Sequence, residues 1–190
     1  MAARSGRPLD GALTVTLLDC TLEILAQDGL GRITTDVVAA RAQAGKSAIY
    51  RRWPSAQELV VDALRTCTLV PDVTDTGSLR GDLVALLDPW THPLDRCERA
   101  ASALLGHAGR GTVLDEVLER GVVQPLAAAV TRITDRHAAR ADVLTGVQVR
   151  LLVVVVQSMW WQRYTSNRPA STTAEVEQMV DLVLLPITTS

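Results

Sequence analysis

Residues Thr34 to Trp53 are Thr-Thr-Asp-Val-Val-Ala-Ala-Arg-Ala-Gln-Ala-Gly-Lys-Ser-Ala-Ile-Tyr-Arg-Arg-Trp, and they are the most informative part of the chain. Thr34 or Thr35 can cap a helix, because a hydroxyl oxygen accepts a hydrogen bond from a backbone N–H of the first turn. A second helix can begin at Gly45 and ends before Pro54, since the residue preceding a proline is disfavoured in the α region. The stretch predicts two short helices joined by a tight turn, as in a helix-turn-helix motif.

The second of these helices has two chemically different sides. Ile49 and Trp53 lie four residues apart and can share a buried face. Small residues at its start would let the helix sit deep in the major groove of DNA, while longer polar side chains reach phosphates and base edges. The alternative is a solvated cationic face on an ordinary helical hairpin. The polar side carries Lys46, Ser47, Tyr50 and Arg51.

The order of features around this stretch resembles the DNA-binding domain of the TetR family of bacterial repressors. Gly6-Arg7-Pro8 comes first, a helical segment covers about residues 10–27, and Ile33-Thr34 opens the next helix. The run Ala-Gly-Lys-Ser-Ala-Ile-Tyr-Arg-Arg-Trp-Pro-Ser is similar to the family's recognition helix and the start of its linker helix. Two positions depart from the pattern: Gln43 replaces a turn glycine, and Asp36 is acidic where a neutral or basic residue is common.

The resemblance implies an all-α fold in two parts. Residues 1–54 would form a three-helix, helix-turn-helix DNA-binding domain, followed by a linker helix over residues 55–69. Residues 70–190 would form a helical domain for effector binding and dimerisation. It also implies a repressor that binds a palindromic operator in double-stranded DNA as a homodimer and is released by a small, largely apolar effector. A DNA-binding adaptor regulated by a protein partner is the alternative.

The DNA contacts expected from this arrangement come from three places. Lys46 and Tyr50 should mainly contact phosphates, with Arg52 completing the cationic segment, and Thr34 and Thr35 offer hydroxyl or helix-terminus contacts. Arg4 and Arg7 would reach the backbone or minor groove from an arm. The residues expected to contact base edges are Ser47, Ala48 and Arg51.

Charge and hydropathy agree with a local DNA contact on a separate regulatory body. Residues 1–54 carry seven Lys/Arg and five Asp/Glu, whereas the whole chain has a net charge of −2. A mildly basic head on an acidic body fits this division. Helical periodicity predicts further helices over about residues 55–67, 79–87, 94–107, 112–136, 141–164 and 173–185.

Two late helices carry more apolar surface than a small body readily covers, so we expect them to form a four-helix dimer interface, with packing inside one chain as the alternative. The interface candidates are Val147, Leu151, Val154, Val155, Val176, Met179, Val180, Leu182 and Val183. Aromatic and Met side chains at helical spacing are either core residues or the lining of an effector pocket. The pocket candidates are Trp90, His107, Met159, Trp160 and Tyr164.

No pattern typical of an enzyme is present, and we predict no catalytic residue, cofactor or metal. The Glu-x-x-His spacing of di-metal bundles is absent, and there is no phosphate-binding glycine loop or nucleophile elbow. Cys20, Cys67 and Cys97 are widely spaced and odd in number, which favours free thiols in a reducing cytoplasm. The most apolar segment, residues 143–164, contains Arg150 and Arg163 and is too interrupted for a membrane span.

Overall fold

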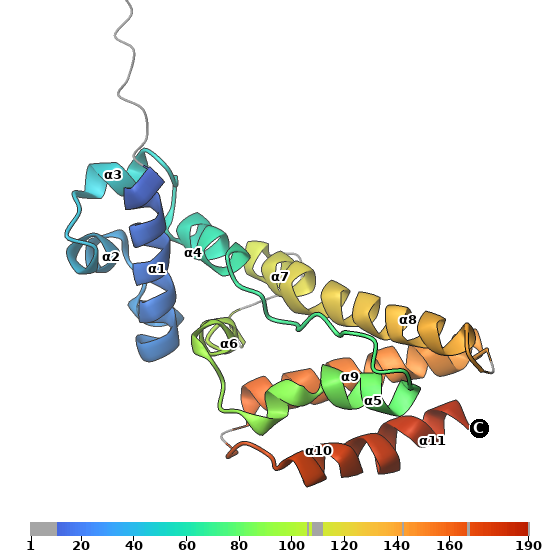
Figure 1. Cartoon of the computed structure of the whole chain (residues 1–190). Coiled ribbons are helices and arrows are strands. Elements are labelled where there is room, and N and C mark those ends of the chain that lie inside the picture. The colour runs from blue at the N-terminus through green and yellow to red at the C-terminus, as the bar shows by residue number, and fades with distance from the viewer. Residues whose placement is uncertain (1–10, 106, 108–111, 142, 167, 190) are drawn as a thin grey trace, which may run out of the picture.

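The computed structural model describes residues 11–105, 107, 112–141, 143–166 and 168–189. Every regular element in these ranges is helical (Figure 1), which confirms the all-α fold class. The head contains α1 (Gly11–Asp28), η1 (Leu30–Arg32), α2 (Thr35–Arg41) and α3 (Lys46–Tyr50), and α4 (Ala56–Arg65) follows. The body contains α5 (Leu79–Leu86), η2 (Asp88–Thr91), α6 (Arg96–Ser102), α7 (Val113–Leu118), η3 (Glu119–Val123), α8 (Gln124–Ala138), α9 (Gly146–Thr165), α10 (Thr173–Met179), η4 (Val180–Leu184) and α11 (Leu185–Thr188).

Side-chain caps set several helix starts where the sequence predicts them. Thr34, Ser55 and Ser78 each accept a hydrogen bond from the backbone N–H three residues later, at the starts of α2, α4 and α5. Such a cap satisfies one of the backbone donors that the first helical turn leaves without a partner. The direction in which the chain enters α2, α4 and α5 is therefore fixed by local chemistry.

Two buried clusters form the interior, and α1 contributes to both. Leu17 and Ile24 of α1 belong to the smaller cluster in the head, whereas Leu22 and Leu25 belong to the larger cluster in the body. These pairs lie on adjacent stripes of one helix, as their spacing requires. The smaller cluster consists of Leu17, Ile24, Val38, Ala39, Ile49, Trp53 and Leu59.

The linker helix α4 is shared in the same way. Leu59 packs into the head cluster, while Val60 and Leu64 pack into the body cluster. Trp53 is only 4% exposed, and its indole Nε1 donates a 2.8 Å hydrogen bond to Oδ2 of Asp62. The head is therefore attached to the body through α1 and α4 by continuous apolar packing.

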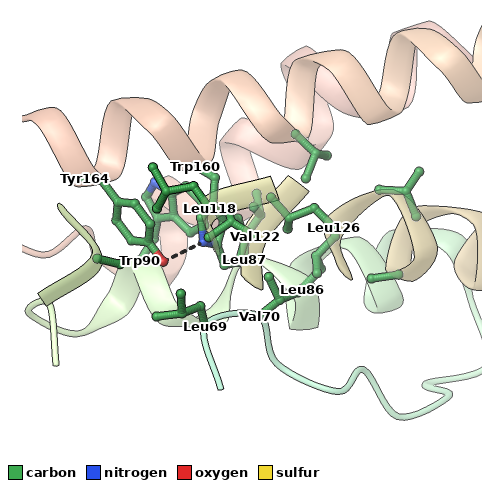
Figure 2. Close-up of a cluster of buried hydrophobic side chains, with 14 of the residues drawn as sticks. Leu69, Val70, Leu86, Leu87, Trp90, Leu118, Val122, Leu126, Trp160 and Tyr164 are labelled. Carbon is green, nitrogen blue, oxygen red and sulfur yellow. Dashed lines mark hydrogen bonds between the residues drawn. The ribbon is translucent and has the colours of Figure 1, made fainter. Parts of the chain in front are cut away.

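The body consists of layered helices. α7, η3 and α8 follow one another along one side, and both α9 and α5 pack against α8. The segment from α10 to α11 lies beyond them, with η4 against α5 and α11 against α9 (Figure 1). Leu118, Val122 and Leu126 point from the first of these layers toward Trp90 and Trp160 (Figure 2). No helix in the described ranges is long and apolar enough to cross a membrane.

Two predicted helices contain a wider turn that the sequence does not reveal. Residues Glu119–Val123 and Val180–Leu184 form π-helical segments, in which one more residue is accommodated than in a regular α-helical turn. Such bulges shift the side chains that follow relative to a regular 3.6-residue repeat. Val176 and Val180, which precede or open the second of these segments and were predicted for the dimer interface, are buried in the chain's own core. That part of the interface prediction is wrong for an interface formed by the exposed surface.

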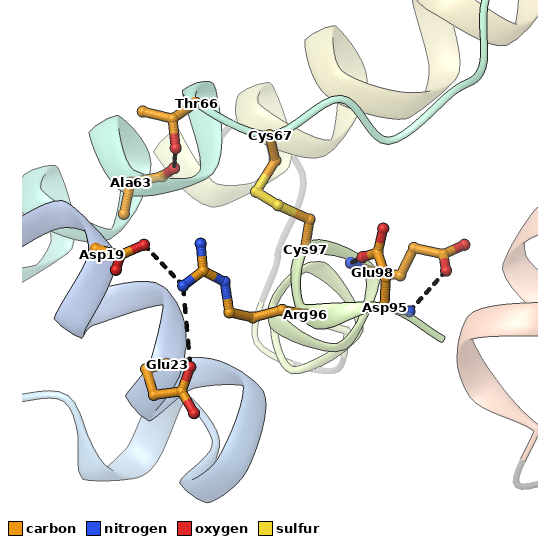
Figure 3. Close-up of a disulfide and its surroundings, with 9 residues drawn as sticks. All are labelled: Asp19, Glu23, Ala63, Thr66, Cys67, Asp95, Arg96, Cys97 and Glu98. Atoms are coloured by element: carbon orange, nitrogen blue, oxygen red, sulfur yellow. Dashed lines mark hydrogen bonds and ion pairs between the residues drawn. A yellow bond between two sulfur atoms is a disulfide. The ribbon is translucent and has the colours of Figure 1, made fainter. Parts of the chain in front are cut away.

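The cysteine prediction is also wrong for two of the three residues. Cys67 and Cys97 form a disulfide with a Cα–Cα distance of 5.7 Å (Figure 3), and Cys20 is the free cysteine. Wide sequence spacing gave no sign of the bridge, because the end of α4 and the start of α6 approach one another only through the packing of the body. The bridge therefore joins the linker helix to the body.

Candidate DNA-binding surface

The turn between α2 and α3 takes the left-handed shape that a glycine would favour. Gln43 has a φ of 51°, in the region that costs a residue with a Cβ atom about 1–2 kcal/mol. The backbone N–H of Gln43 donates to the carbonyl of Ala40, and that of Ala44 donates to the carbonyl of Ala39. This pair of bonds satisfies the last carbonyls of α2 and forms a Schellman motif. The turn therefore has the shape expected with glycine, although position 43 is occupied by Gln.

Packing into the head cluster fixes the orientation of α3. Ile49 is fully buried and Ala48 is 6% exposed, so both face the core together with Trp53. Lys46, Ser47 and Tyr50 are exposed on the other side. The prediction that Ala48 contacts base edges is therefore corrected: its methyl group is buried and is not part of the exposed side of α3.

Two polar contacts join the exposed side of α3 to the first turn of α2. The hydroxyl groups of Thr35 and Tyr50 lie 3.1 Å apart and share a hydrogen bond. Nζ of Lys46 lies 2.7 Å from Oδ1 of Asp36, and this hydrogen-bonded carboxylate raises the pKa of the lysine. The start of α2 and the exposed side of α3 thus form one surface. Sequence reasoning noted Asp36 as a departure but did not identify its pairing with Lys46.

The two adjacent arginines after α3 point in different directions. Arg51 is exposed at the end of the helix. Arg52 is half-buried, and its guanidinium donates to Oγ1 of Thr14 at 2.8 Å and to the carbonyl of Ala48 at 2.7 Å. Arg52 therefore fastens α3 to α1, a structural role that its sequence position did not show.

The described residues of the predicted DNA-binding set other than Ala48 and Arg52 thus keep their polar side chains on α2 and α3 and at the end of α3. These two helices lie at the side of the head away from α8 (Figure 1). Thr34 is exposed and already caps α2 through its side chain. Arg4 and Arg7 lie outside the described residues. The surface consists of Thr34, Thr35, Lys46, Ser47, Tyr50 and Arg51, and we call it the α3 surface.

The predicted pocket residues are distributed over separate places in the body. Trp160 is fully buried and Tyr164 is 5% exposed; Trp160 Nε1 donates to the Tyr164 hydroxyl at 3.2 Å (Figure 2). The Trp90 ring meets the Trp160 ring edge to face, with centroids 4.5 Å apart. Burial raises the pKa of the Tyr164 hydroxyl. Trp160 and Tyr164 are therefore tightly packed core residues, while Met159 is half-buried at the edge of that core.

Two cavities are lined by the remaining candidates. Trp90 and Met179 line a groove of about 490 Å³ beside η2 and the end of α9. Arg163 also lines it and forms a buried ion pair with Glu98, with Nη2 and Oε2 2.8 Å apart. His107 lines a separate cavity of about 360 Å³ between η1, α4 and α7. Sequence reasoning did not identify the buried pair, because its partners are 65 residues apart.

Acidic, cysteine and histidine side chains do not converge on a metal site in the described part of the chain. No group of three or more of them is placed to hold a metal ion there.

Comparison with known proteins links both parts of the chain to one class of regulator. Residues 17–63 match the family described as bacterial regulatory proteins, tetR family, and residues 73–183 match the tetracyclin repressor-like C-terminal domain. An uncharacterized HTH-type transcriptional regulator of Mycobacterium tuberculosis is 31% identical over 175 residues, which cover 90% of this chain and 85% of that protein. A DNA-binding transcriptional repressor TetR of Mycobacteroides abscessus is 31% identical over 182 residues, covering 90% and 92%.

A solved structure shows the same fold. The multidrug binding protein EbrR, in a complex with ethidium, superimposes with a TM-score of 0.60 at 21% identity, covering 93% of this chain and 98% of the other. At this identity the likeness concerns the arrangement of helices.

Proposed function

The chain belongs to the tetR family of bacterial regulatory proteins and is a DNA-binding transcriptional regulator, and on that premise we propose that it is a repressor. A homodimer binds a palindromic operator through the α3 surface of each protomer. A small, largely apolar effector bound in the body then releases the DNA.

The observation that carries this proposal is the construction of the α3 surface. Ile49 and Trp53 anchor α3 from the inside, so the exposed side is presented on a rigid base. Lys46 and Tyr50 supply phosphate contacts, while Ser47 and Arg51 reach base edges. A guanidinium at the end of such a helix can donate two hydrogen bonds to one guanine.

Dimerisation is supported by an apolar face that one chain leaves open. Val147, Leu151 and Val154 of α9 are 56%, 48% and 57% exposed and lie at spacings of four and three residues, on one side of the helix. Leu182 and Val183 of η4 are 75% and 46% exposed. Val155 and Met179, half-buried, border this face. A second copy would cover the face and place two α3 surfaces on successive major grooves, about 34–36 Å apart.

Effector binding is supported by the groove at Trp90. Its wall combines Trp90 and Met179 with a polar rim that includes Arg99, Gln162, Arg163 and Arg168. Its volume of about 490 Å³ is within the usual range for small-molecule sites. The ethidium complex of EbrR shows that a protein of this fold holds a planar aromatic molecule. An effector acts only if it binds the DNA-competent and incompetent dimers with different affinity.

A protein partner in place of the small molecule is the second candidate. The open apolar face of α9 and η4 is the observation in its favour, since such a face can bind another protein as well as a second copy. A heterologous partner would change operator affinity without any ligand in the Trp90 groove.

The test begins with selection of bound duplexes from random DNA. We expect a palindrome whose half-sites are one helical turn or a near multiple apart. Titration of aromatic compounds, followed by tryptophan fluorescence and by operator binding in parallel, then tests release. Recovery of no common sequence contradicts the proposal. If compounds that bind the body never alter operator affinity while a protein partner does, the adaptor function replaces effector release.

A further inference from the structure

We propose that Cys67 and Cys97 are a redox modification site, at which a hydroperoxide closes the disulfide and thereby weakens operator binding. The inference rests on the proposed DNA-binding function and adds a second input to it. It starts from the position of the bridge at the junction of head and body (Figure 3).

Cys67 lies just beyond the end of the linker helix. α4 ends at Arg65, and Thr66 closes its last turn by donating from Oγ1 to the carbonyl of Ala63 at 2.7 Å. Leu59 of the same helix packs in the head and Leu64 packs in the body. A displacement of Cys67 therefore moves a helix that contacts both the head and the body.

Cys97 lies in the first turn of α6, next to a contact with the head. Nη1 of Arg96 is 2.7 Å from Oδ1 of Asp19 and 3.9 Å from Oε2 of Glu23, both on α1 (Figure 3). α6 therefore already contacts α1 by ion pairs, and the bridge adds a covalent bond to α4. A disulfide requires Cα atoms about 4.4–6.8 Å apart, so the bridged form can occupy only arrangements in which α4 and α6 stay close. Two thiols impose no such limit.

The two sulfurs are accessible to small reagents. Both cysteines are half-buried. Cys67 also lines a cavity of about 180 Å³ together with Arg65, Glu116 and Arg120. The rest of the cavity lining is mainly apolar, from side chains such as Leu69 and Val117. A small hydroperoxide that enters this cavity meets Cys67 first. Cationic neighbours favour a thiolate, the form that attacks a peroxide.

The chemistry balances with a hydroperoxide as the oxidant. The Cys67 thiolate attacks the terminal oxygen of ROOH, the O–O bond breaks, and the departing oxygen takes a proton to give ROH and a sulfenic acid on Cys67. The Cys97 thiolate then attacks that sulfur, the S–O bond breaks, and water leaves as the disulfide forms. The thiols lose two electrons and the peroxide gains them. A dithiol reverses the step by exchange through a mixed disulfide.

The direction of the effect follows from the resting state. A regulator of bacterial DNA works in a compartment that keeps thiols reduced, so the dithiol form is the one that must bind the operator at rest. With α4 and α6 free to adjust, each head can reach its half-site. Closing the bridge restricts the head to the orientations that the bridged junction allows, which costs affinity.

The experiment uses the full-length protein and the duplex selected with the dithiothreitol-reduced form. After treatment with hydrogen peroxide, mass spectrometry establishes the 67–97 bridge, and fluorescence anisotropy measures operator affinity. We expect a loss of at least about fivefold, the lower end of ordinary coupling between sites, with recovery after dithiothreitol. Cys20→Ser should respond as the parent does, whereas the Cys67→Ser/Cys97→Ser double variant should bind the operator and ignore peroxide. In Cys97→Ser, dimedone should trap a sulfenic acid on Cys67.

Three results would overturn the proposal. Affinity that changes less than about twofold with the bridge fully formed excludes control through this site, and this comparison needs no variant to fold. Thiols that stay reduced under peroxide exclude the chemistry. An equal loss of affinity in the double variant assigns the effect to another residue. If the reduced protein selects no DNA at all, the proposed function itself is wrong, and redox control of operator binding is then wrong as well.

Discussion

At the scale of single residues, the α3 surface holds an opposed pair of charges. Asp36 carries a negative charge where DNA phosphates would approach, and it holds Lys46 at 2.7 Å. Both side chains are well exposed, at 62% and 59%. An exposed pair of this kind contributes little to folding. Its effect is on binding, since Lys46 must exchange a carboxylate for a phosphate.

Replacing Asp36 by Asn should therefore tighten DNA binding. Lys46 would then neutralise a phosphate without first leaving a carboxylate, so affinity rises for every sequence and the salt dependence steepens by about one unit of slope. Lys46→Ala should flatten the slope by a similar amount. The double variant Asp36→Asn/Lys46→Ala should behave like Lys46→Ala alone. If Asp36→Asn tightens binding equally without Lys46, the carboxylate acts by direct repulsion of DNA.

Trp53 supports the surface from behind. Truncation of Trp53 to Ala should lower the free energy of unfolding by about 3–5 kcal/mol, because it empties the centre of the head cluster. Trp53→Phe should cost less, since it keeps most of the apolar contact and loses the hydrogen bond to Asp62. Urea denaturation measures both. A Trp53→Ala protein as stable as the parent but unable to bind DNA would make Trp53 a contact residue.

Among the elements, the turn before α3 is less stable than it would be with glycine at position 43, because Gln43 has a Cβ atom in a left-handed backbone conformation. Gln43→Gly should stabilise the protein by roughly 0.5–1 kcal/mol, because glycine adopts a φ of 51° without the Cβ penalty and loses part of that gain as chain entropy. Gln43→Ala serves as the control, because alanine keeps the penalty. Equal stabilisation by Ala and Gly in urea denaturation would show that the Gln side chain, and not the backbone, is the source of the cost.

Local signals in the sequence were sufficient for the starts of α2, α4 and α5 and for the turn before α3. Hydroxyl caps at Thr34, Ser55 and Ser78, and the left-handed residue at Gln43, are each decided by a few neighbouring residues. The order of features from residue 6 to 64 then indicated how these elements are used. For that reason the fold class and the location of the α3 surface were predictable.

Contacts between helices that are far apart in the sequence were not predictable in the same way. The pairing of Cys67 with Cys97 and of Glu98 with Arg163 depends on how α6 packs, which no local pattern encodes. Apolar periodicity shows that Val176 and Leu182 are both on an apolar helix, but not that the first is covered by its own chain. The wider turns at η3 and η4 further shift such faces.

At the scale of the whole molecule, the apolar face of α9 should hold two protomers together. Leu151→Glu/Val154→Glu should convert the dimer to monomers, since burying two carboxylates against apolar surface carries a large desolvation cost. Sedimentation velocity measures this. Val15 of α1 is 67% exposed and lies outside the face, so Val15→Glu should leave the dimer intact. A double variant that remains dimeric would place the interface elsewhere.

Binding of operator DNA by the α3 surface is tested by the affinity of a Lys46→Ala/Tyr50→Ala/Arg51→Ala variant for the selected duplex. All three side chains are exposed, so the thermal denaturation midpoint should stay close to that of the parent. Arg51 alone should contribute about 1–3 kcal/mol of sequence discrimination if it pairs with guanine. We predict that the folded triple variant loses specific binding in fluorescence anisotropy. Unchanged operator affinity in that folded variant would show that the α3 surface does not bind the operator.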